Sequence, residues 1–281
     1  MLALLHGLPI QSPTTATVVE LGAGRGTNLL SLAALQPRAR FIGVERDAAL
    51  RVEALATARE LGLANVAFED AAPPADYVIA TDFDGDLSTV RLAPGGVAVL
   101  GHETTVGADE VSPLRGLMRL HVARCDREDV PHQARAIAAW NVARRARLHG
   151  EARAAPLRAT LAEVDAMSDA ALVRWLERTP LSFDDLAPAG LTWLTNARMH
   201  EASAAALPES LRSIAKTYDP LPRQALIDHL LMPRWRTTIV CRVDAPIVRA
   251  ATPQAFAPFW VASRVAARKL GEPPFKITTE A

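Results

Sequence analysis

The stretch Val18-Val19-Glu20-Leu21-Gly22-Ala23-Gly24-Arg25-Gly26-Thr27-Asn28 decides the fold of this chain. It predicts a short apolar strand that runs through an acidic residue into a glycine-rich turn, followed by a helix over residues 27–35. Glycine lets a backbone bend this sharply and approach a ligand closely. The first turn of the helix leaves free N–H groups pointing at the same place. The stretch therefore predicts a ligand-binding turn at the end of a strand.

The glycine spacing narrows the class of ligand. Enzymes that bind NAD use Gly-x-Gly-x-x-Gly at such a turn, with the third glycine packing the helix against the strand. Here the pattern is Gly-x-Gly-x-Gly, and Thr27 holds the position of that third glycine. The spacing therefore argues against NAD. A plain turn without a ligand is the alternative, but it has no need for three alternating glycines and their entropic cost.

Composition places the chain among ordered globular proteins of one or two domains, with 281 residues, 49% hydrophobic and 22% charged. Lys and Arg together number 31, as do Asp and Glu, so no net field draws the chain to nucleic acid or to an anionic membrane. Cys125 and Cys241 are too few and too far apart for a disulfide framework or a zinc site, so we expect no metal and a reducing, cytoplasmic location. No run reaches the roughly 18 apolar residues of a membrane span.

The first hundred residues alternate strand and helix. Residues 47–61 have the pattern of an amphipathic helix, with Asp47 as its N-cap and Gly62 as its stop. Its apolar residues at helical spacing are expected to face the sheet: Leu50, Ala54, Leu55, Ala58 and Leu61. Strands separated by single helices imply right-handed crossovers and a parallel sheet, with ligands at the carboxyl-terminal ends of the strands. The five predicted strands cover residues 18–21, 41–45, 66–68, 77–80 and 97–100.

The alternation then gives way to helices. Helical periodicity covers residues 114–123, 131–148, 156–164 and 169–176, and strand signals return at residues 190–195 and 235–243. A mainly helical connector over residues 199–231 joins these two strands, and residues 256–269 form one more amphipathic helix. The pattern predicts a core at residues 1–102, a helical insertion at 103–188, the last two strands with their connector at 189–245, and a helical extension at 246–281.

The turn with its preceding acidic residue resembles the first motif of class I S-adenosylmethionine (SAM) methyltransferases. The block Arg234-Trp235-Arg236-Thr237-Thr238-Ile239-Val240-Cys241-Arg242 looks like one found in bacterial methyltransferases with a "methyltransferase regulatory domain", which include protein lysine methyltransferases. The resemblance covers most of residues 16–245, and this chain is shorter at both ends than members of that family. It implies an α/β fold, a Rossmann-like sheet of seven strands with a helical insertion, in which only strand seven is antiparallel and lies between strands five and six.

The resemblance also implies the cofactor and the residues that hold it. The cofactor is S-adenosyl-L-methionine, with its amino-acid part against the turn and its ribose diol at Glu45, which ends the second strand. Arg46 lies beside that site. The family usually has an aspartate near the adenine after the third strand, where this chain has Ala72, so Asp70 and Ala71 are the candidates there. The turn itself contributes Glu20, Gly22, Ala23, Gly24, Gly26 and Asn28.

The candidates for catalysis follow the fourth and fifth strands. Asp82 holds the place where these enzymes put groups that face the reacting methyl, and a loop that caps the next helix is the alternative. After the fifth strand, where the family carries aromatic and asparagine side chains, this chain has His102 and Glu103. We expect either of these or Asp82 to accept a hydrogen bond from the acceptor amine.

The leading hypothesis is a SAM-dependent methyltransferase acting on protein lysine. Two alternatives stay open: a catalytically weak methyltransferase-like subunit that binds a partner, and a methyltransferase with a small-molecule acceptor. Since the altered segment after the fifth strand lacks the family's side chains, we expect cofactor binding to survive better than turnover.

Overall fold

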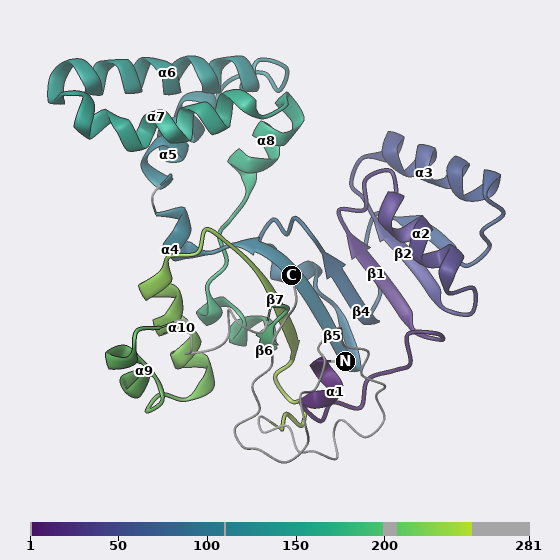
Figure 1. Cartoon of the computed structure of the whole chain (residues 1–281). Helices are drawn as coiled ribbons and strands as arrows, with labels where there is room; N and C mark the ends of the chain where they lie inside the picture. The colour runs from purple at the N-terminus through teal and green to yellow at the C-terminus, as the bar shows by residue number, and fades with distance from the viewer. Residues whose placement is uncertain (1, 110, 199–206, 249–281) are drawn as a thin grey trace, which may run out of the picture.

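The computed structural model describes residues 2–109, 111–198 and 207–248 and shows a single seven-stranded sheet (Figure 1). The strand order is β3-β2-β1-β4-β5-β7-β6. All pairs among β1 to β5 are parallel, whereas β7 is antiparallel to β5 and to β6. The predicted Rossmann-like sheet and the place of strand seven are confirmed. The strands are β1 Thr17–Leu21, β2 Arg40–Val44, β3 Val66–Glu69, β4 Ala75–Ala80, β5 Leu92–Glu103, β6 Leu191–Asn196 and β7 Trp235–Arg242.

Alternate residues of β1 face opposite sides of the sheet. Val18 packs in a core with Leu29 of helix α2 (Thr27–Leu35), and Val19 packs on the other side with Ile42 and Val78. Burial on both faces explains why the strand is apolar throughout apart from its acidic residue. Helix α3 (Ala48–Glu60) covers the first of these faces, and Ala54 and Ala58 are its buried residues.

The helix boundaries follow their capping residues. The Asp47 side chain accepts a hydrogen bond from the Ala49 N–H and so begins α3 as predicted. The helix ends at Glu60, and Leu61, which was predicted to face the sheet, is 60% exposed. That part of the prediction is wrong: Leu61 is the C-cap residue at the end of the helix, and its side chain lies in solvent. Gly62 follows with φ +68.

Strand β7 also has two buried faces. Ile239 and Cys241 pack together with Val97, and Val240 packs on the opposite side with Ala98 and Leu100. This is the alternation that the two-residue repeat of a β-strand produces. On the side of Ile239 the core includes Ala3 of the short helix α1 (Leu2–Leu5).

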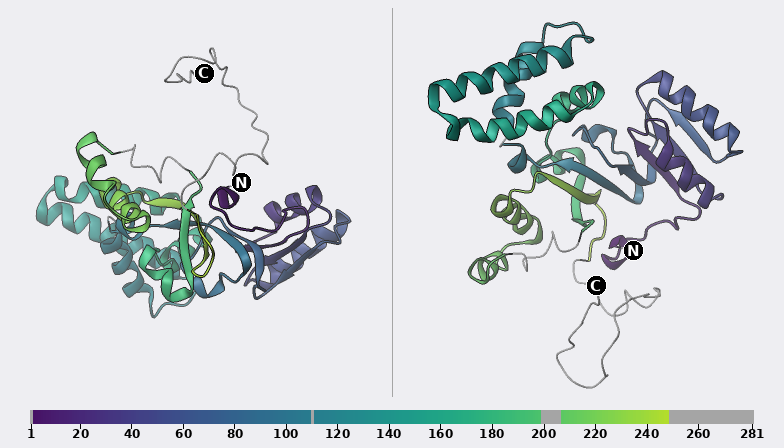
Figure 2. Two further views of the ribbon diagram at one scale, coloured as in Figure 1. Left: turned by 90° about the horizontal axis from the view of Figure 1, so that it is seen from below. Right: turned by 45° about the horizontal axis from the view of Figure 1, so that its top comes forward.

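The insertion forms a bundle with its own apolar core, which contains Leu114, Met118, Val142, Leu172 and Trp175. Figures 1 and 2 show this bundle standing off the end of β5, with α6 and α7 side by side. Strand β5 continues to Glu103, past the predicted boundary after residue 102, and the domain limits stay a prediction. The helices are α4 Thr105–Ala108, α5 Ser112–Val122, α6 Val130–His149, α7 Glu151–Ala166 and α8 Asp169–Glu177.

The remaining short elements join the bundle and the connector to the sheet. Helix α10 (Pro220–Leu231) is tied to β7 by an ion pair of 2.5 Å between Asp228 and Arg236, both buried. The predicted helix over residues 256–269 lies outside the described residues, as does most of the predicted extension at 246–281. The other elements are α9 Glu209–Ala215 and the 3₁₀ turns η1 Leu87–Thr89, η2 Phe183–Asp185 and η3 Ala187–Ala189.

Gly26 provides a direct test of how α2 packs on the sheet. A Cβ added there would lie 2.4 Å from the Phe68 ring, at φ +75. We expect Gly26→Ala to lower the free energy of unfolding by about 3 kcal/mol, because overpacking adds to left-handed backbone strain. Gly62→Ala is the matched control, with φ +68 and nothing within 4 Å, and should cost about 1 kcal/mol. Equal losses in urea denaturation would contradict this packing.

Candidate functional site

The glycine turn lies against the end of β2. The N–H groups of Gly22 and Ala23 both donate to the Val44 carbonyl, at 2.9 and 3.0 Å. Gly22 and Gly24 have φ +68 and +54, and a Cβ at either would meet nothing within 4 Å. Gly26 differs, since its missing Cβ faces Phe68. The first two glycines therefore leave space for a ligand, whereas the third packs the helix against the sheet.

Glu45 lies directly over this turn. Its Oε2 accepts a hydrogen bond of 2.9 Å from the Gly24 N–H, and its Oε1 accepts one of 3.0 Å from the Asp47 N–H. Each carboxylate oxygen can accept two hydrogen bonds. One acceptor site therefore remains on each oxygen, the arrangement that a pair of neighbouring hydroxyl groups requires. The sequence analysis assigned Glu45 and the turn to one site, and in the structure the Gly24 N–H bonds directly to the Glu45 carboxylate.

Glu20 is buried in β1 beneath the turn. Its Oε1 accepts a hydrogen bond of 2.9 Å from the Asn28 side chain, while its Oε2 is buried and has no hydrogen-bond partner. Burial raises the pKa of Glu20, and the hydrogen bonds from Asn28 and from the Leu29 backbone oppose that rise. An unsatisfied buried carboxylate oxygen is costly, so this atom favours a ligand that brings a hydrogen-bond donor.

Two loops flank the turn. Arg46 Nη2 lies 3.6 Å from Asp84 and 3.8 Å from Asp86, so the segment after β2 meets the segment after β4 across the end of β1. Arg46 is exposed and acts as this bridge, beside the predicted cofactor site. Asp70 and Ala71 are also exposed and follow β3, where the Glu45 N–H donates to the Glu69 carbonyl. The structure thus gathers the candidates for cofactor binding at one edge of the sheet.

Asp82 follows β4 at the same edge. Its carboxylate forms an ion pair with Arg178, which comes from the end of the helical insertion. The Arg178 guanidinium also lies over the ring of Trp235, 5.0 Å from its centre. Sequence analysis did not identify Arg178, since nothing in its local sequence distinguishes it from the other arginines of the insertion. Trp235 belongs to the segment 234–242 that resembles the bacterial methyltransferases, but the sequence analysis assigned it no function.

Glu103 is buried in an ion pair rather than turned to a substrate. Arg115 Nη2 donates to its Oε1 at 2.7 Å, and Arg115 Nη1 lies 2.7 Å from its Oε2. Arg115 in turn lies over Trp175, 4.5 Å from the ring centre. This cluster joins β5 to α5 and α8. Both Glu103 oxygens thus lie against the Arg115 guanidinium, and the predicted catalytic role of Glu103 stays a prediction.

His102 is also buried, on the opposite side of β5. Its Nε2 lies 2.9 Å from Thr238 Oγ1 and its Nδ1 lies 3.1 Å from the Glu103 carbonyl. Burial lowers the pKa of His102 to about 4, opposed by the backbone hydrogen bond and assisted by the positive charge of Arg236. The imidazole is therefore neutral near pH 7 with a partner at each nitrogen, and its predicted catalytic role stays a prediction.

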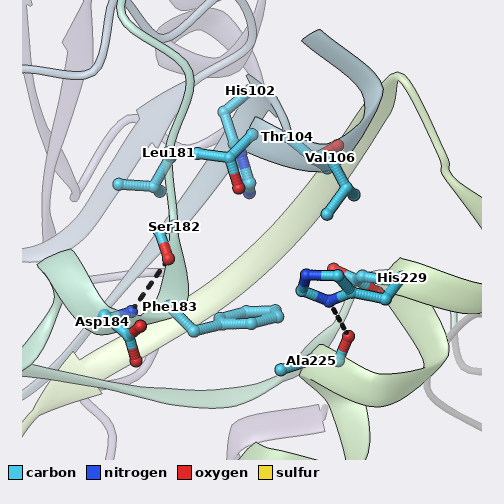
Figure 3. A pocket seen from close by; sticks show the side chains of 11 residues that line it. His102, Thr104, Val106, Leu181, Ser182, Phe183, Asp184, Ala225 and His229 are labelled. Carbon is cyan, nitrogen blue, oxygen red and sulfur yellow. Dashed lines mark hydrogen bonds between the residues drawn. The ribbon is translucent and has the colours of Figure 1, made fainter. Parts of the chain in front are cut away.

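His102 lines a small cavity of about 80 Å³ between the end of β5, the segment 181–184 and α10 (Figure 3). Phe183 and His229 face each other across it, and the His229 ring lies 2.8 Å from the Ala225 carbonyl. Pockets that bind whole small molecules are several times larger, about 300 Å³ or more. The cavity is therefore not the cofactor site. Sequence analysis missed it, because its lining joins residues far apart in the chain.

Comparison with solved structures identifies the architecture. PKMT2 from Rickettsia typhi superposes with a TM-score of 0.69, at 19% identity over 92% of this chain and 55% of PKMT2. The same protein in complex with AdoHcy superposes with a TM-score of 0.67, at 20% identity over 91% of this chain and 54% of that one. The chain has the fold of the class I SAM-dependent methyltransferases. The predicted resemblance to that class is confirmed.

Sequence comparisons find two further likenesses, each over less than half of the chain. A family model described as "Putative methyltransferase" matches residues 14–84, which contain the glycine turn, Glu45 and Asp82. RP789, an uncharacterised protein of Rickettsia prowazekii (strain Madrid E), is 29% identical over 142 residues, covering 43% of this chain and 25% of that protein. The chain spans about half the length of PKMT2 and a quarter of this relative.

Two further properties concern only the described residues. Across residues 2–109, 111–198 and 207–248, no three His, Cys, Asp or Glu side chains gather closely enough to hold a metal ion. Within the same ranges, every helix is too short or too polar to cross a bilayer.

His102 gives the stability of the methyltransferase fold a defined pH dependence. Its folded pKa of about 4 lies below the usual 6.5, so between these values the unfolded chain binds a proton that the folded chain does not. The free energy of unfolding should therefore fall by up to about 3 kcal/mol as the pH drops from 6.5 to 4. His102→Gln should show a shallower slope in urea denaturation over this range. Parallel slopes for the two proteins would contradict the buried neutral imidazole.

Proposed function

We propose that the chain binds SAM over the glycine turn and transfers its methyl group to a nucleophile. The observation that supports this most is the position of the Glu45 carboxylate, bonded to the Gly24 N–H and facing the open space over Gly22 and Gly24. AdoHcy is bound by PKMT2, which has the same fold. The proposal assigns the corresponding ligand to this chain.

The residues at the turn fit such a ligand chemically. The free acceptor sites of Glu45 match the two hydroxyl groups of a ribose. The unpartnered Glu20 Oε2 matches a charged amino group, which would also offset the cost of burying that carboxylate. Asp70 and Ala71 lie beside Glu45, where a base attached to that ribose would extend. Arg46 closes the edge through its ion pairs with Asp84 and Asp86.

SAM supplies an electrophilic methyl group on a sulfonium, and its transfer is an in-line displacement that needs no metal. The protein contributes alignment, which can account for several kcal/mol of the barrier. It must also accept an unprotonated nucleophile. For lysine, with a reference pKa near 10.4, the neutral form costs roughly 4 kcal/mol near pH 7.5. Asp82, at the end of β4 beside the turn, is the residue placed to receive the acceptor.

Protein lysine is the acceptor we propose, on the basis of the sequence resemblance to bacterial protein lysine methyltransferases. The exposed carboxylate of Asp82 is compatible with a long cationic side chain arriving from solvent. A small-molecule acceptor is an outcome that the experiment below distinguishes. The predicted cytoplasmic location and a partner subunit stay predictions.

A second candidate function is that of a weakly active subunit that binds SAM and a partner. One observation favours it: each of the three predicted catalytic side chains is engaged within the chain. Asp82 is paired with Arg178, Glu103 with Arg115, and His102 with Thr238. Turnover in the isolated chain then depends on releasing Asp82, since the other two are buried.

The cofactor site is tested by ligand-induced stabilisation. S-adenosylhomocysteine at 100 times its Kd should add about 2.7 kcal/mol to the free energy of unfolding, which raises Tm. Gly24→Val should abolish the rise, because its branched side chain fills the space over the turn. Gly62→Val has a similar backbone strain far from the turn and should keep the rise. NAD should have no effect. Stabilisation retained by Gly24→Val would place the ligand elsewhere.

Transfer is tested by intact-mass spectrometry of candidate proteins incubated with the chain and labelled SAM. We expect slow addition of fixed mass increments to lysine-containing proteins, each equal to 14 Da for a methyl group that replaces a hydrogen plus the extra mass of the label. Asp82→Asn should lower turnover at least tenfold while changing SAM affinity less than twofold, because its contact is with the acceptor. Label found only in small molecules would refute the protein acceptor. Rapid methylation unaffected by Asp82→Asn would refute the role of Asp82.

A further inference from the structure

We propose that Asp82 and Trp235 form a cation-recognition subsite for the charged side chain of a substrate lysine, and that Arg178 fills this subsite in the free chain. The substrate class rests on the function proposed above. A carboxylate and an aromatic face are the two groups that bind an ammonium most readily in proteins. Here both hold one internal cation, the Arg178 guanidinium.

The subsite lies where an acceptor must arrive. Asp82 follows β4, which pairs with β1 and so ends beside the glycine turn. Trp235 begins β7 and is paired with Glu103 at the end of β5. The two receptor groups therefore come from the ends of β4 and β7, on either side of the end of β5. Arg178, which contacts both, lies at the end of the helical insertion.

A second arginine in the chain makes the same pair of contacts, with a carboxylate and an indole ring, but in a buried position. Arg115 also lies between a carboxylate and an indole, those of Glu103 and Trp175, but its side chain is 4% exposed and that of Glu103 is 2% exposed. In the Arg178 cluster the Arg178 side chain is 14% exposed, but its partners are open to solvent: the Asp82 side chain is 48% exposed and Trp235 is 41% exposed. Exposed ion pairs contribute little to stability. The first cluster is thus structural, whereas the second can exchange its cation.

The main chain at Arg178 is fixed without help from its side chain. The Arg178 N–H donates to the Arg174 carbonyl at 3.0 Å, its carbonyl accepts from Arg119 Nη2 at 2.6 Å, and the Thr179 N–H donates to the Asp84 carbonyl at 2.8 Å. The side chain can therefore leave the subsite while the end of the insertion stays in place. For the same reason, substitution of this side chain should leave the fold intact.

The test is an NMR titration of ¹⁵N-labelled protein with Nα-acetyl-lysine methylamide, following the indole N–H of Trp235, which Trp235→Phe identifies. Arg178→Met removes the internal cation and keeps the apolar stem. We expect this variant to bind the probe about tenfold more tightly than the unaltered chain. Asp82→Asn in the Arg178→Met background should lose the gain, and the uncharged Nα-acetyl-norleucine methylamide should show none.

Arg135→Met is the matched control, since it breaks another Arg–Asp pair of the insertion, the 2.7 Å contact with Asp169, away from the subsite. It should bind the probe like the unaltered chain. Equal probe affinity in the unaltered chain and Arg178→Met, or a gain that persists without the Asp82 charge, would overturn the proposal. So would a loss of S-adenosylhomocysteine affinity, rather than probe affinity, in Asp82→Asn. The titration needs no cofactor, so failure of SAM binding would refute the proposed function separately.

Discussion

Strand β1 is paired in parallel with β2 on one side and β4 on the other, and the rest of the structure depends on this constraint. Parallel pairing brings the carboxyl ends of the three strands to one edge of the sheet. It places the glycine turn between Glu45 and Asp82, which are 37 residues apart in sequence (82 − 45). The Arg46 ion pairs with Asp84 and Asp86 then join the flanking loops across the turn. The strand order alone therefore predicts a ligand site at this edge of the sheet.

Two arginines of the helical insertion form ion pairs with residues at that edge of the sheet. The two pairs differ in how deeply they are buried. Arg115 sits in a buried pair with Glu103, where loss of either partner would leave an uncompensated charge in the core. Arg178 is paired with Asp82, whose side chain is 48% exposed, so water screens that carboxylate. We propose that this second contact, and not the buried one, rearranges when a cationic substrate binds.

The sheet and most helix boundaries could be predicted because they depend on local patterns: apolar strands, the Asp47 cap and the glycine turn. The contacts of the candidate catalytic residues could not, since they join distant positions. Asp82 meets Arg178 across 96 residues, and His102 meets Thr238 across 136. Glu103 was predicted to face a substrate, but its direction depends on where α5 places Arg115. The glycine turn was enough to predict where the candidate site lies. The partners of its charged side chains could be read only from the three-dimensional structure.

We propose that the glycine turn and Glu45 hold the cofactor, and a crystal structure of the chain with S-adenosylhomocysteine would show whether they do. We expect both ribose hydroxyls within hydrogen-bond distance of Glu45, the amino-acid part over Gly22 and Gly24, and its amino group near Glu20. A ligand bound away from the turn, with Glu45 bonded only to the Gly24 and Asp47 N–H groups, would contradict it.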